Sequence, residues 1–329
     1  MTTPTYFFLR RRMLKLLATT AVFWGVAASQ AQSAPPYEAL KELRIGYQKA
    51  AVNLVIVKQS GALEKRFPNA RVQWIEFPAG PQLLEALAVG SLEFGLTGDS
   101  PPVFAQAAGK DLLYVGAEPP KPDSSAILVL DDSPLKKLAD LKGKRIALQK
   151  GSSAHYLLVR AVEKAGLQWS DIQPVYLAPA DARAAFERKS VDAWAIWDPF
   201  YAAIQLALKP RALATGRDLS SNNSFYLASR ALTFQHPQAL AVLHEELSRA
   251  DRIAQQQRPV AIKLVSDFSG LDAGIVSLFI QRRPASPVGP LTPHIVADQQ
   301  RVADAFFKLG LIPKPVKVAD IVWRPESAK

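Results

Sequence analysis

Hydrophobic residues along the chain follow two alternating patterns. Short apolar runs predict β-strands, and longer stretches with apolar residues three and four positions apart predict helices. The predicted strands are residues 43–47, 72–77, 93–98, 112–117, 126–130, 144–149, 175–178 and 191–197. The predicted helices are residues 52–67, 81–90, 100–110, 153–166, 181–189 and 198–208. Beyond residue 225 the pattern is mostly helical.

This alternation predicts an α/β protein with two lobes. Strand–helix–strand units build mainly parallel sheets that are flanked by helices. Two short polar stretches, EPPKPDSS at 118–125 and SSNNS at 220–224, interrupt the pattern and predict two crossings between lobes. We therefore expect a first lobe of residues 40–121 and 225–329, a second lobe of residues 122–224, and a ligand cleft between the lobes.

The N-terminus is typical of an export signal. Three arginines at 10–12 precede an apolar stretch at 13–28, and the small residues Ser29 and Ala31 fit a cleavage site. This stretch is too short to span a bilayer. We expect residues 1–31 to be a signal peptide that directs the chain to the periplasm. Arg10 and Arg11 fit the twin-arginine route, and the general secretory (Sec) route stays open.

Composition narrows the class of function. Hydrophobic residues make up 49% of the 329 positions and charged residues 21%, which is typical of a globular protein. The formal charge of +11 falls to +7 without residues 1–31, and the remaining bases are scattered, so we expect no nucleic-acid partner. The chain has no cysteine and four isolated histidines. We therefore expect no disulfide, no metal site and no cofactor, and we expect a monomer.

The stretch KGSSAHYLL at 150–158 joins a predicted strand to a predicted helix. It does not fit the P-loop pattern, and Ala154 replaces the second glycine of a nucleophile elbow. With Ser152 as N-cap, the N–H groups of Ser153, Ala154 and His155 point out of the helix end. The helix dipole also attracts an anion there.

Two other interpretations of this stretch stay open. In the first, Ser152 only caps a helix. In the second, Ser152 or Ser153 is the nucleophile and His155 the base of an exported hydrolase. Residues two or three apart at one helix start do not generally face each other, so we favour the anion site over the hydrolase. We expect His155 to be a satisfied first-turn histidine rather than a catalytic base.

Two further strand–helix junctions carry polar side chains. EFGLTGDSPP at 93–102 offers Thr97, Asp99 and Ser100, with Asp99 or Ser100 as the helix cap. WDPF at 197–200 places Trp197 at the carboxyl end of a strand, where ligands lie in open α/β sheets, and Asp198 as an N-cap.

Several longer motifs together resemble a known family. They are GYQK at 46–49, EFPAGPQLLEAL at 76–87, FGLTGDSPP at 94–102, KGSSAHYLL at 150–158 and YLAPADARAAFERKSVDAWAIWDPF at 176–200. In this order they are similar to the aliphatic sulfonate-binding proteins of bacterial ABC importers, which have a two-lobe type II periplasmic binding fold. Toward the C-terminus QRRPASPVGPL at 281–291 matches no motif.

The resemblance implies a ligand pocket and a transport function. The implied pocket residues, with His155 added because it shares a helix start with the serines, are Gln48, Gly98, Asp99, Ser100, Ser152, Ser153, Ala154, His155, Trp197 and Asp198. We expect a protein that is not an enzyme, which captures a small organosulfonate for sulfur acquisition and delivers it to the transmembrane subunits of an ABC permease.

A sulfonate suits such a pocket because it carries one negative charge and three acceptor oxygens, which serine hydroxyls and helix N–H groups can satisfy. Asp99 and Asp198 are compatible with an anion if each is tied down as a helix cap or meets an amine at the far end of the ligand, and we favour capping. Binders of taurine, nitrate or a thiamine precursor share the fold and stay open as alternatives. An exported serine hydrolase is the alternative from another class.

Overall fold

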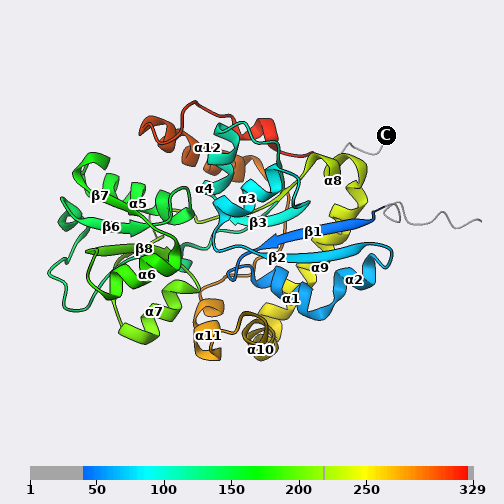
Figure 1. Cartoon of the computed structure of the whole chain (residues 1–329), viewed down its shortest axis with the longest axis horizontal. Coiled ribbons are helices and arrows are strands. Elements are labelled where there is room, and N and C mark those ends of the chain that lie inside the picture. The colour runs from blue at the N-terminus through cyan, green and yellow to red at the C-terminus, as the bar shows by residue number, and fades with distance from the viewer. Residues whose placement is uncertain (1–39, 218, 325–329) are drawn as a thin grey trace, which may run out of the picture. The chain divides into compact units, whose positions relative to one another are not determined.

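The computed structural model describes residues 40–217 and 219–324 (Figure 1), all within one compact unit that spans residues 35–329. The predicted signal peptide, residues 1–31, lies outside the described residues and stays a prediction. No helix of the described part is long and apolar enough to cross a membrane.

The first sheet has five strands, and four of them run in one direction. Their order is β2 (Arg71–Glu76), β1 (Glu42–Tyr47), β3 (Phe94–Gly98), β10 (Ser224–Ala228) and β4 (Leu113–Glu118). Strand β1 pairs in parallel with both β2 and β3, whereas β10 lies antiparallel between β3 and β4. The antiparallel strand is therefore β10, the first strand after the chain returns from the second sheet.

The second sheet repeats this plan. Its order is β7 (Gln173–Tyr176), β6 (Arg145–Leu148), β8 (Ala193–Trp197), β5 (Ser125–Val129) and β9 (Arg211–Thr215). Strand β6 is parallel to β7 and β8, and β5 is antiparallel to β8 and β9. Here too the first strand after a crossing is reversed. The predicted α/β class with mainly parallel sheets is confirmed, and each sheet is mixed because of that strand.

Helices cover both faces of the first sheet (Figure 1). One face carries α1 (Val52–Ser60), α2 (Ala62–Arg66), α8 (Arg230–Gln235), α9 (Pro237–Gln256), α10 (Arg258–Ser269) and α11 (Ala273–Gln281). The other carries α3 (Gly80–Ala88), α4 (Ser100–Ala107) and α12 (Pro293–Lys308). Alternate residues of β10 point to opposite faces of the sheet. Tyr226 packs in the hydrophobic cluster on the α1 side, and Phe225 packs in the cluster on the α3 side.

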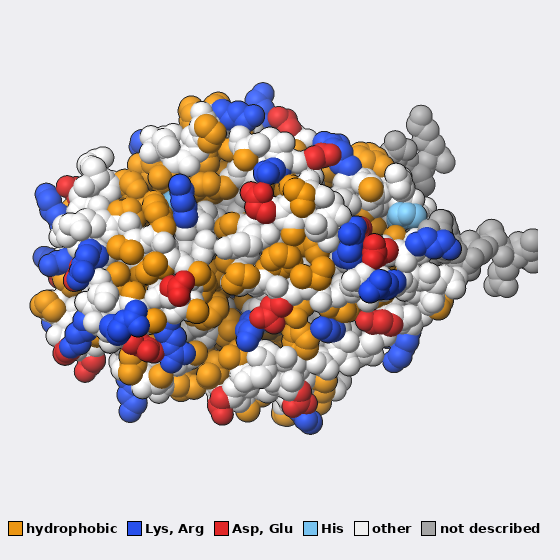
Figure 2. Space-filling view, in the orientation of Figure 1, with side chains coloured by type: hydrophobic (Ala, Val, Ile, Leu, Met, Phe, Trp, Pro, Cys, Tyr) orange, Lys and Arg blue, Asp and Glu red, His pale blue; other side chains and the backbone are white. Residues whose placement is uncertain are grey.

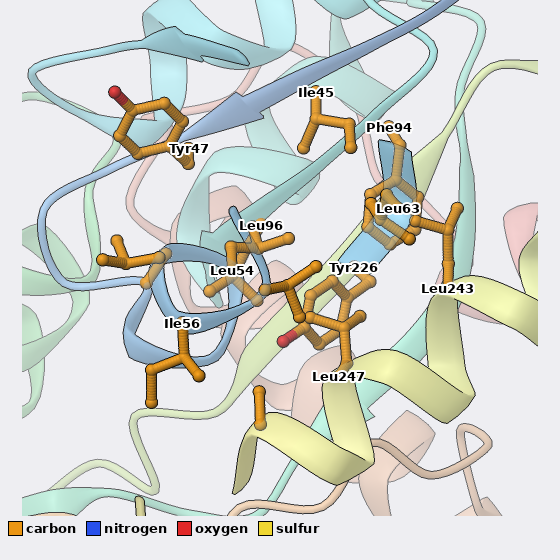
Figure 3. Close-up of a cluster of buried hydrophobic side chains, with 14 of the residues drawn as sticks. Ile45, Tyr47, Leu54, Ile56, Leu63, Phe94, Leu96, Tyr226, Leu243 and Leu247 are labelled. Carbon is orange, nitrogen blue, oxygen red and sulfur yellow. The ribbon is translucent and has the colours of Figure 1, made fainter. Parts of the chain in front are cut away.

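The core on the α1 side is shown in Figure 3. Ile45 from β1, Phe94 from β3 and Tyr226 from β10 meet Leu54 of α1 and Leu243 of α9, and all five side chains are buried. The Phe94 and Tyr226 rings stack with centroids 5.5 Å apart. Burying a side chain of this size contributes about 1.5–3 kcal/mol relative to leaving it exposed, so each of the five stabilises the fold.

The segment 52–67 departs from the sequence prediction of a single helix. Gly61 adopts a left-handed conformation with φ of 59° and separates α1 from α2. Its N–H donates to the carbonyl of Lys58, which closes the end of α1. Glycine adopts this conformation without steric cost, so one periodic stretch contains two helices.

The second sheet is also covered on both faces. Helix α5 (Ser153–Lys164) packs on one face, and α6 (Pro179–Glu187) and α7 (Phe200–Leu208) pack on the other. Strand β8 alternates between them, because Ala195 faces the α5 cluster and Trp194 the α6 cluster.

Two connections join the sheets and lie side by side. One runs from Glu118 to Ser125 and the other from Thr215 to Ser224. The N–H of Lys121 donates to the carbonyl of Ser221 at 2.9 Å, and the side-chain amide of Asn222 donates back to the carbonyl of Lys121 at 3.0 Å. The predicted lobe limits stay a proposal. Strand β10 begins at Ser224, one residue before the position where the first lobe is predicted to resume, residue 225.

Gly216 packs closely against the first connection, because a Cβ added there would overlap the Pro122 backbone. We predict that Gly216→Ala lowers the free energy of unfolding by about 1–3 kcal/mol in a urea titration. Gly289→Ala is the matched control, since its added Cβ meets nothing within 4 Å. The control should stay within about 0.5 kcal/mol of wild type. Equal effects of the two changes would show that the connections are not tightly packed.

Candidate functional site

A polar cavity of about 70 Å³ lies where the ends of β1, β3 and β8 meet the start of α5. Six of the residues singled out from the sequence line it: Gln48, Gly98, Ser152, Ser153, Trp197 and Asp198. The other four do not line this cavity; they are Asp99, Ser100, Ala154 and His155. Its walls come from both sheets and from both connections between them.

The start of α5 presents backbone donors to this cavity. Ser152 is extended, with ψ of 171°, and α5 begins at Ser153. Within the described part of the chain, the N–H groups of Ser153 and Ala154 have no hydrogen-bond partner. The prediction was wrong for His155, whose N–H donates to the carbonyl of Ser152 at 2.9 Å. Two unpaired N–H groups and the helix dipole remain to attract an anion.

His155 is buried in the core, but it is not fully satisfied as predicted, because among the described residues its Nε2 has no hydrogen-bond partner. Its Nδ1 accepts a hydrogen bond from the N–H of Gly151 at 3.2 Å, and its ring packs against Phe306 and Trp169 at centroid distances of 5.1 and 5.3 Å. Burial, with a smaller effect of Lys150, lowers the pKa of His155 to about 3. The imidazole therefore stays neutral and faces away from the cavity, which corrects its assignment as a ligand-binding residue.

Ser153 also touches the opposite sheet. A Cβ added at Gly98 would overlap the Ser153 hydroxyl oxygen, so the two residues are in direct contact. Gly98 is the last residue of β3, and Ser153 is the first of α5. Only glycine leaves room for this approach, which brings the two sides of the cavity together.

Asp99 is satisfied in a different way from the predicted helix cap. Its side chain makes no capping hydrogen bond to α4. Instead, the hydroxyl of Ser100 donates to its Oδ1 at 2.9 Å and that of Ser220 to its Oδ2 at 3.5 Å. Burial raises the pKa of Asp99 to about 6 against the effect of these hydroxyls. Asp99 lines a separate cavity, and the side chain of Ser153, which lines the polar cavity, also hydrogen-bonds to its carboxylate.

Asp198 bonds to the first turn of α7, but it is not the predicted N-cap, because that position is occupied by Pro199. Its Oδ1 accepts the N–H of Ala202 at 3.0 Å and a hydrogen bond from Nη1 of Arg282 at 2.8 Å. Burial raises the pKa of Asp198 to about 6, although Arg282 opposes the shift. Among the described residues its Oδ2 has no partner, so one acceptor in the cavity wall is free for a ligand donor.

Two cations in the cavity wall were missed from the sequence. They are Lys121, in the first connection, and Arg283, after α11. Both contact the buried Glu118 carboxylate, at 3.0 Å from Nζ of Lys121 and 3.2 Å from Nη2 of Arg283. Burial would raise the pKa of Glu118, but the two cations outweigh it and hold the pKa at about 2.

This cluster sets the charge of the cavity. With both bases protonated and Glu118 ionised, the three groups carry a net charge of +1, and the ionised Asp198 in the same wall is offset by its ion pair with Arg282. Burial lowers the pKa of Lys121, while Glu118 opposes that shift. A bound anion would add to the stabilisation of the charged ammonium. A lone Lys or Arg in a proline-rich turn has no sequence signal that separates it from a solvated residue, which is why both were missed.

A small polar cavity between two α/β lobes that are joined by two adjacent connections is typical of a two-lobe solute-binding protein. A family model described as NMT1/THI5 like matches residues 72–249. A relative from Escherichia coli (strain K12), named as an aliphatic sulfonates-binding protein, is 46% identical over 315 residues, which cover 96% of this chain and 97% of the relative.

Two solved structures are also similar. The alkanesulfonate-binding protein SsuA from Xanthomonas axonopodis pv. citri, bound to MOPS, is 50% identical with a TM-score of 0.83, covering 86% of this chain and 98% of that one. The periplasmic aliphatic sulphonate binding protein SsuA from Escherichia coli is 48% identical with a TM-score of 0.81, covering 88% and 94%. The chain belongs to the NMT1/THI5-like family and, within it, to the aliphatic sulfonate-binding proteins.

The shifted pKa of Asp198 predicts a pH-dependent stability. Its folded value of about 6 lies above the ordinary 3.8, so the folded state holds the proton more tightly than the unfolded chain. Wild type should therefore lose about 2 kcal/mol of unfolding free energy relative to Asp198→Asn as pH rises from 4 to 7. The titration of Asp99 affects wild type and the variant equally, so it does not contribute to the difference between them. Urea titrations at several pH values measure this difference, and a constant difference would contradict the shifted pKa.

Proposed function

We propose that this protein captures organosulfonates in the periplasm and delivers them to an ABC permease without chemically changing them. The observation that carries the proposal is the cavity's combination of a net charge of +1 with unpaired backbone donors at the start of α5. A sulfonate offers one negative charge and three acceptor oxygens, and at neutral pH it has no proton to donate to Asp198 or Glu118.

The relatives support this assignment. Two solved structures with about half of their residues identical to this chain are named for sulfonate binding, and one of them holds MOPS, itself a sulfonate. The Escherichia coli protein is also described as periplasmic, which fits the predicted signal peptide and either export route. We expect the protein to act as a monomer whose lobes close on the ligand, with Ser153 meeting Gly98, before the closed form docks on the permease.

The alternatives fit the cavity less well. An uncharged thiamine precursor would leave Lys121 and Arg283 without an anionic partner, whereas nitrate and taurine would each match part of the site. Taurine has an ammonium that Asp198 Oδ2 could accept, so it is a candidate ligand of the same class. A serine hydrolase needs a base beside the nucleophile, but His155 bonds to Gly151, and Ser152 donates its hydroxyl to the carbonyl of Gln149.

The start of α5 can be tested by removing one N–H. Ser153→Pro deletes the N–H at the first helical position, where proline fits, and Ser152 is already extended as a following proline requires. Ser153→Ala is the matched control, because both variants lose the hydroxyl. A hydrogen bond to a charged group contributes about 1.5–3 kcal/mol, so the proline variant should bind ethanesulfonate roughly 10- to 150-fold more weakly than the alanine variant.

Calorimetry with ethanesulfonate, taurine, nitrate and sulfate measures these affinities, and melting curves check that both variants fold. Equal binding of ethanesulfonate by the two variants would mean that the Ser153 N–H does not contact the ligand. Binding of nitrate but of no sulfonate would assign the protein to the alternative function.

A further inference from the structure

The end of α11 reaches the wall of the polar cavity through Arg282, the C-cap residue of that helix. Its guanidinium donates from Nη1 to Oδ1 of Asp198 at 2.8 Å and from Nη2 to the side-chain oxygen of Gln205. It also lies over the Tyr201 ring, with Cζ 3.8 Å from the ring centroid. A carboxylate, an amide and an aromatic face, all from the end of β8 and from α7, therefore hold this one arginine in place.

The helices on either side of Arg282 are also packed together. Helix α11 belongs to the hydrophobic cluster of the first sheet and α7 to that of the second, but Ala202 of α7 lies in the first-sheet cluster. A Cβ added at Gly274 of α11 would lie 3.7 Å from Leu206 of α7. Figure 2 shows hydrophobic side chains gathered where Figure 1 places α7 and α11. Apolar contacts between the two helices therefore position Arg282 without help from a ligand.

The two carboxylate oxygens of Asp198 have different surroundings. Oδ1 accepts from Arg282 and from the N–H of Ala202, whereas Oδ2 has no partner within residues 40–217 and 219–324. Asp198 is only 4% exposed and lines the polar cavity, and Arg282 is not among the lining residues. The carboxylate therefore borders the space for the ligand, while the cation that balances it stays outside that space.

The charge of the cavity wall depends on this arrangement. Lys121, Arg283 and the ionised Glu118 leave one positive charge in excess. An ionised Asp198 without a partner would cancel this excess, and the wall would have no net charge left to attract a monoanion. Arg282 prevents the cancellation, because the Asp198–Arg282 pair is itself neutral.

We propose that Arg282 is a specificity-determining residue of the sulfonate site, which neutralises Asp198 from outside the cavity and leaves the excess positive charge of Lys121 and Arg283 for the ligand. The proposal rests on the proposed function, because an anion must occupy the polar cavity. Without Arg282, the same carboxylate would favour a ligand that brings its own cation. The preference of the site would then shift from an alkylsulfonate toward an aminoalkylsulfonate.

The test compares ethanesulfonate with taurine, which carries the same head group and an added ammonium, by calorimetry on the purified protein at pH 8. Arg282→Gln removes the charge and keeps an amide that can donate to Asp198. It should weaken ethanesulfonate at least about 10-fold and shift the ratio of the two dissociation constants at least about 10-fold toward taurine. Arg282→Lys keeps the charge and should recover most of the affinity for ethanesulfonate.

Variants of Asp198 separate the effect of charge from lost packing. Arg282→Gln combined with Asp198→Asn should bind ethanesulfonate within about 3-fold of Asp198→Asn alone, because no carboxylate remains to oppose the anion. Asp198→Asn alone leaves Arg282 charged, so it should bind ethanesulfonate no more weakly than wild type. This single variant tests the proposal even if Arg282→Gln does not fold, and melting curves check the folding of each variant.

The pH profile gives a second readout. The charges near Asp198 are those of Arg282 and Arg283 after α11, Lys121 in the same wall and, when it ionises, Tyr201 of α7. Arg282→Gln leaves all of these in place except its own charge. Because Asp198 opposes an anion only when it is ionised, the affinity of Arg282→Gln for ethanesulfonate should fall as pH rises from about 5 to 8. The double variant should show a smaller fall.

Three results would overturn the role of Arg282. They are equal losses of ethanesulfonate and taurine in Arg282→Gln, a double variant that binds as weakly as Arg282→Gln, and weaker binding of ethanesulfonate by Asp198→Asn than by wild type. If ethanesulfonate does not bind to wild type at all, the proposed function fails instead.

Discussion

One buried carboxylate, Glu118, organises the region where the two lobes meet. It ends β4, where the chain leaves the first sheet, and it contacts Lys121 in the connection and Arg283 after α11. Its other oxygen accepts a hydrogen bond from the Tyr226 hydroxyl at 2.7 Å. An unpaired buried charge would be strongly destabilising, so Glu118 requires both cations nearby. The same requirement leaves the adjoining cavity with one positive charge in excess, which suits a monoanion.

The sequence predicted most of the secondary structure and one part of the site. Local sequence patterns predict local structure. Examples are the alternating residues of β8 and the strand–glycine–serine–helix order at 147–158. Arg283 could not be found in this way, because its place beside Glu118 depends on a contact between residues 165 positions apart. Gly61 was missed for another reason, since a single left-handed glycine ends a helix within an otherwise continuous apolar period.

The start of α5 illustrates how neighbouring residues acquire opposite roles. Successive helical positions are rotated by about 100° around the axis, so Ser153 faces Gly98 across the cavity while His155 is turned into the core. Serine and histidine in this order resemble a nucleophile and its base in the linear sequence, but not in their spatial arrangement. In three dimensions one lines a binding cavity and the other packs against aromatic rings, which favours ligand capture over catalysis.

We infer that Lys121, Arg283 and the start of α5 together recognise a single negative charge. Calorimetry of wild type with ethanesulfonate and with ethyl methyl sulfone tests this directly, because in the sulfone a methyl group replaces one oxygen and removes the charge. We expect ethanesulfonate to bind with a dissociation constant on the order of 1 µM, and the sulfone to bind at least about 10-fold more weakly. Equal affinities, or no binding of ethanesulfonate, would contradict it.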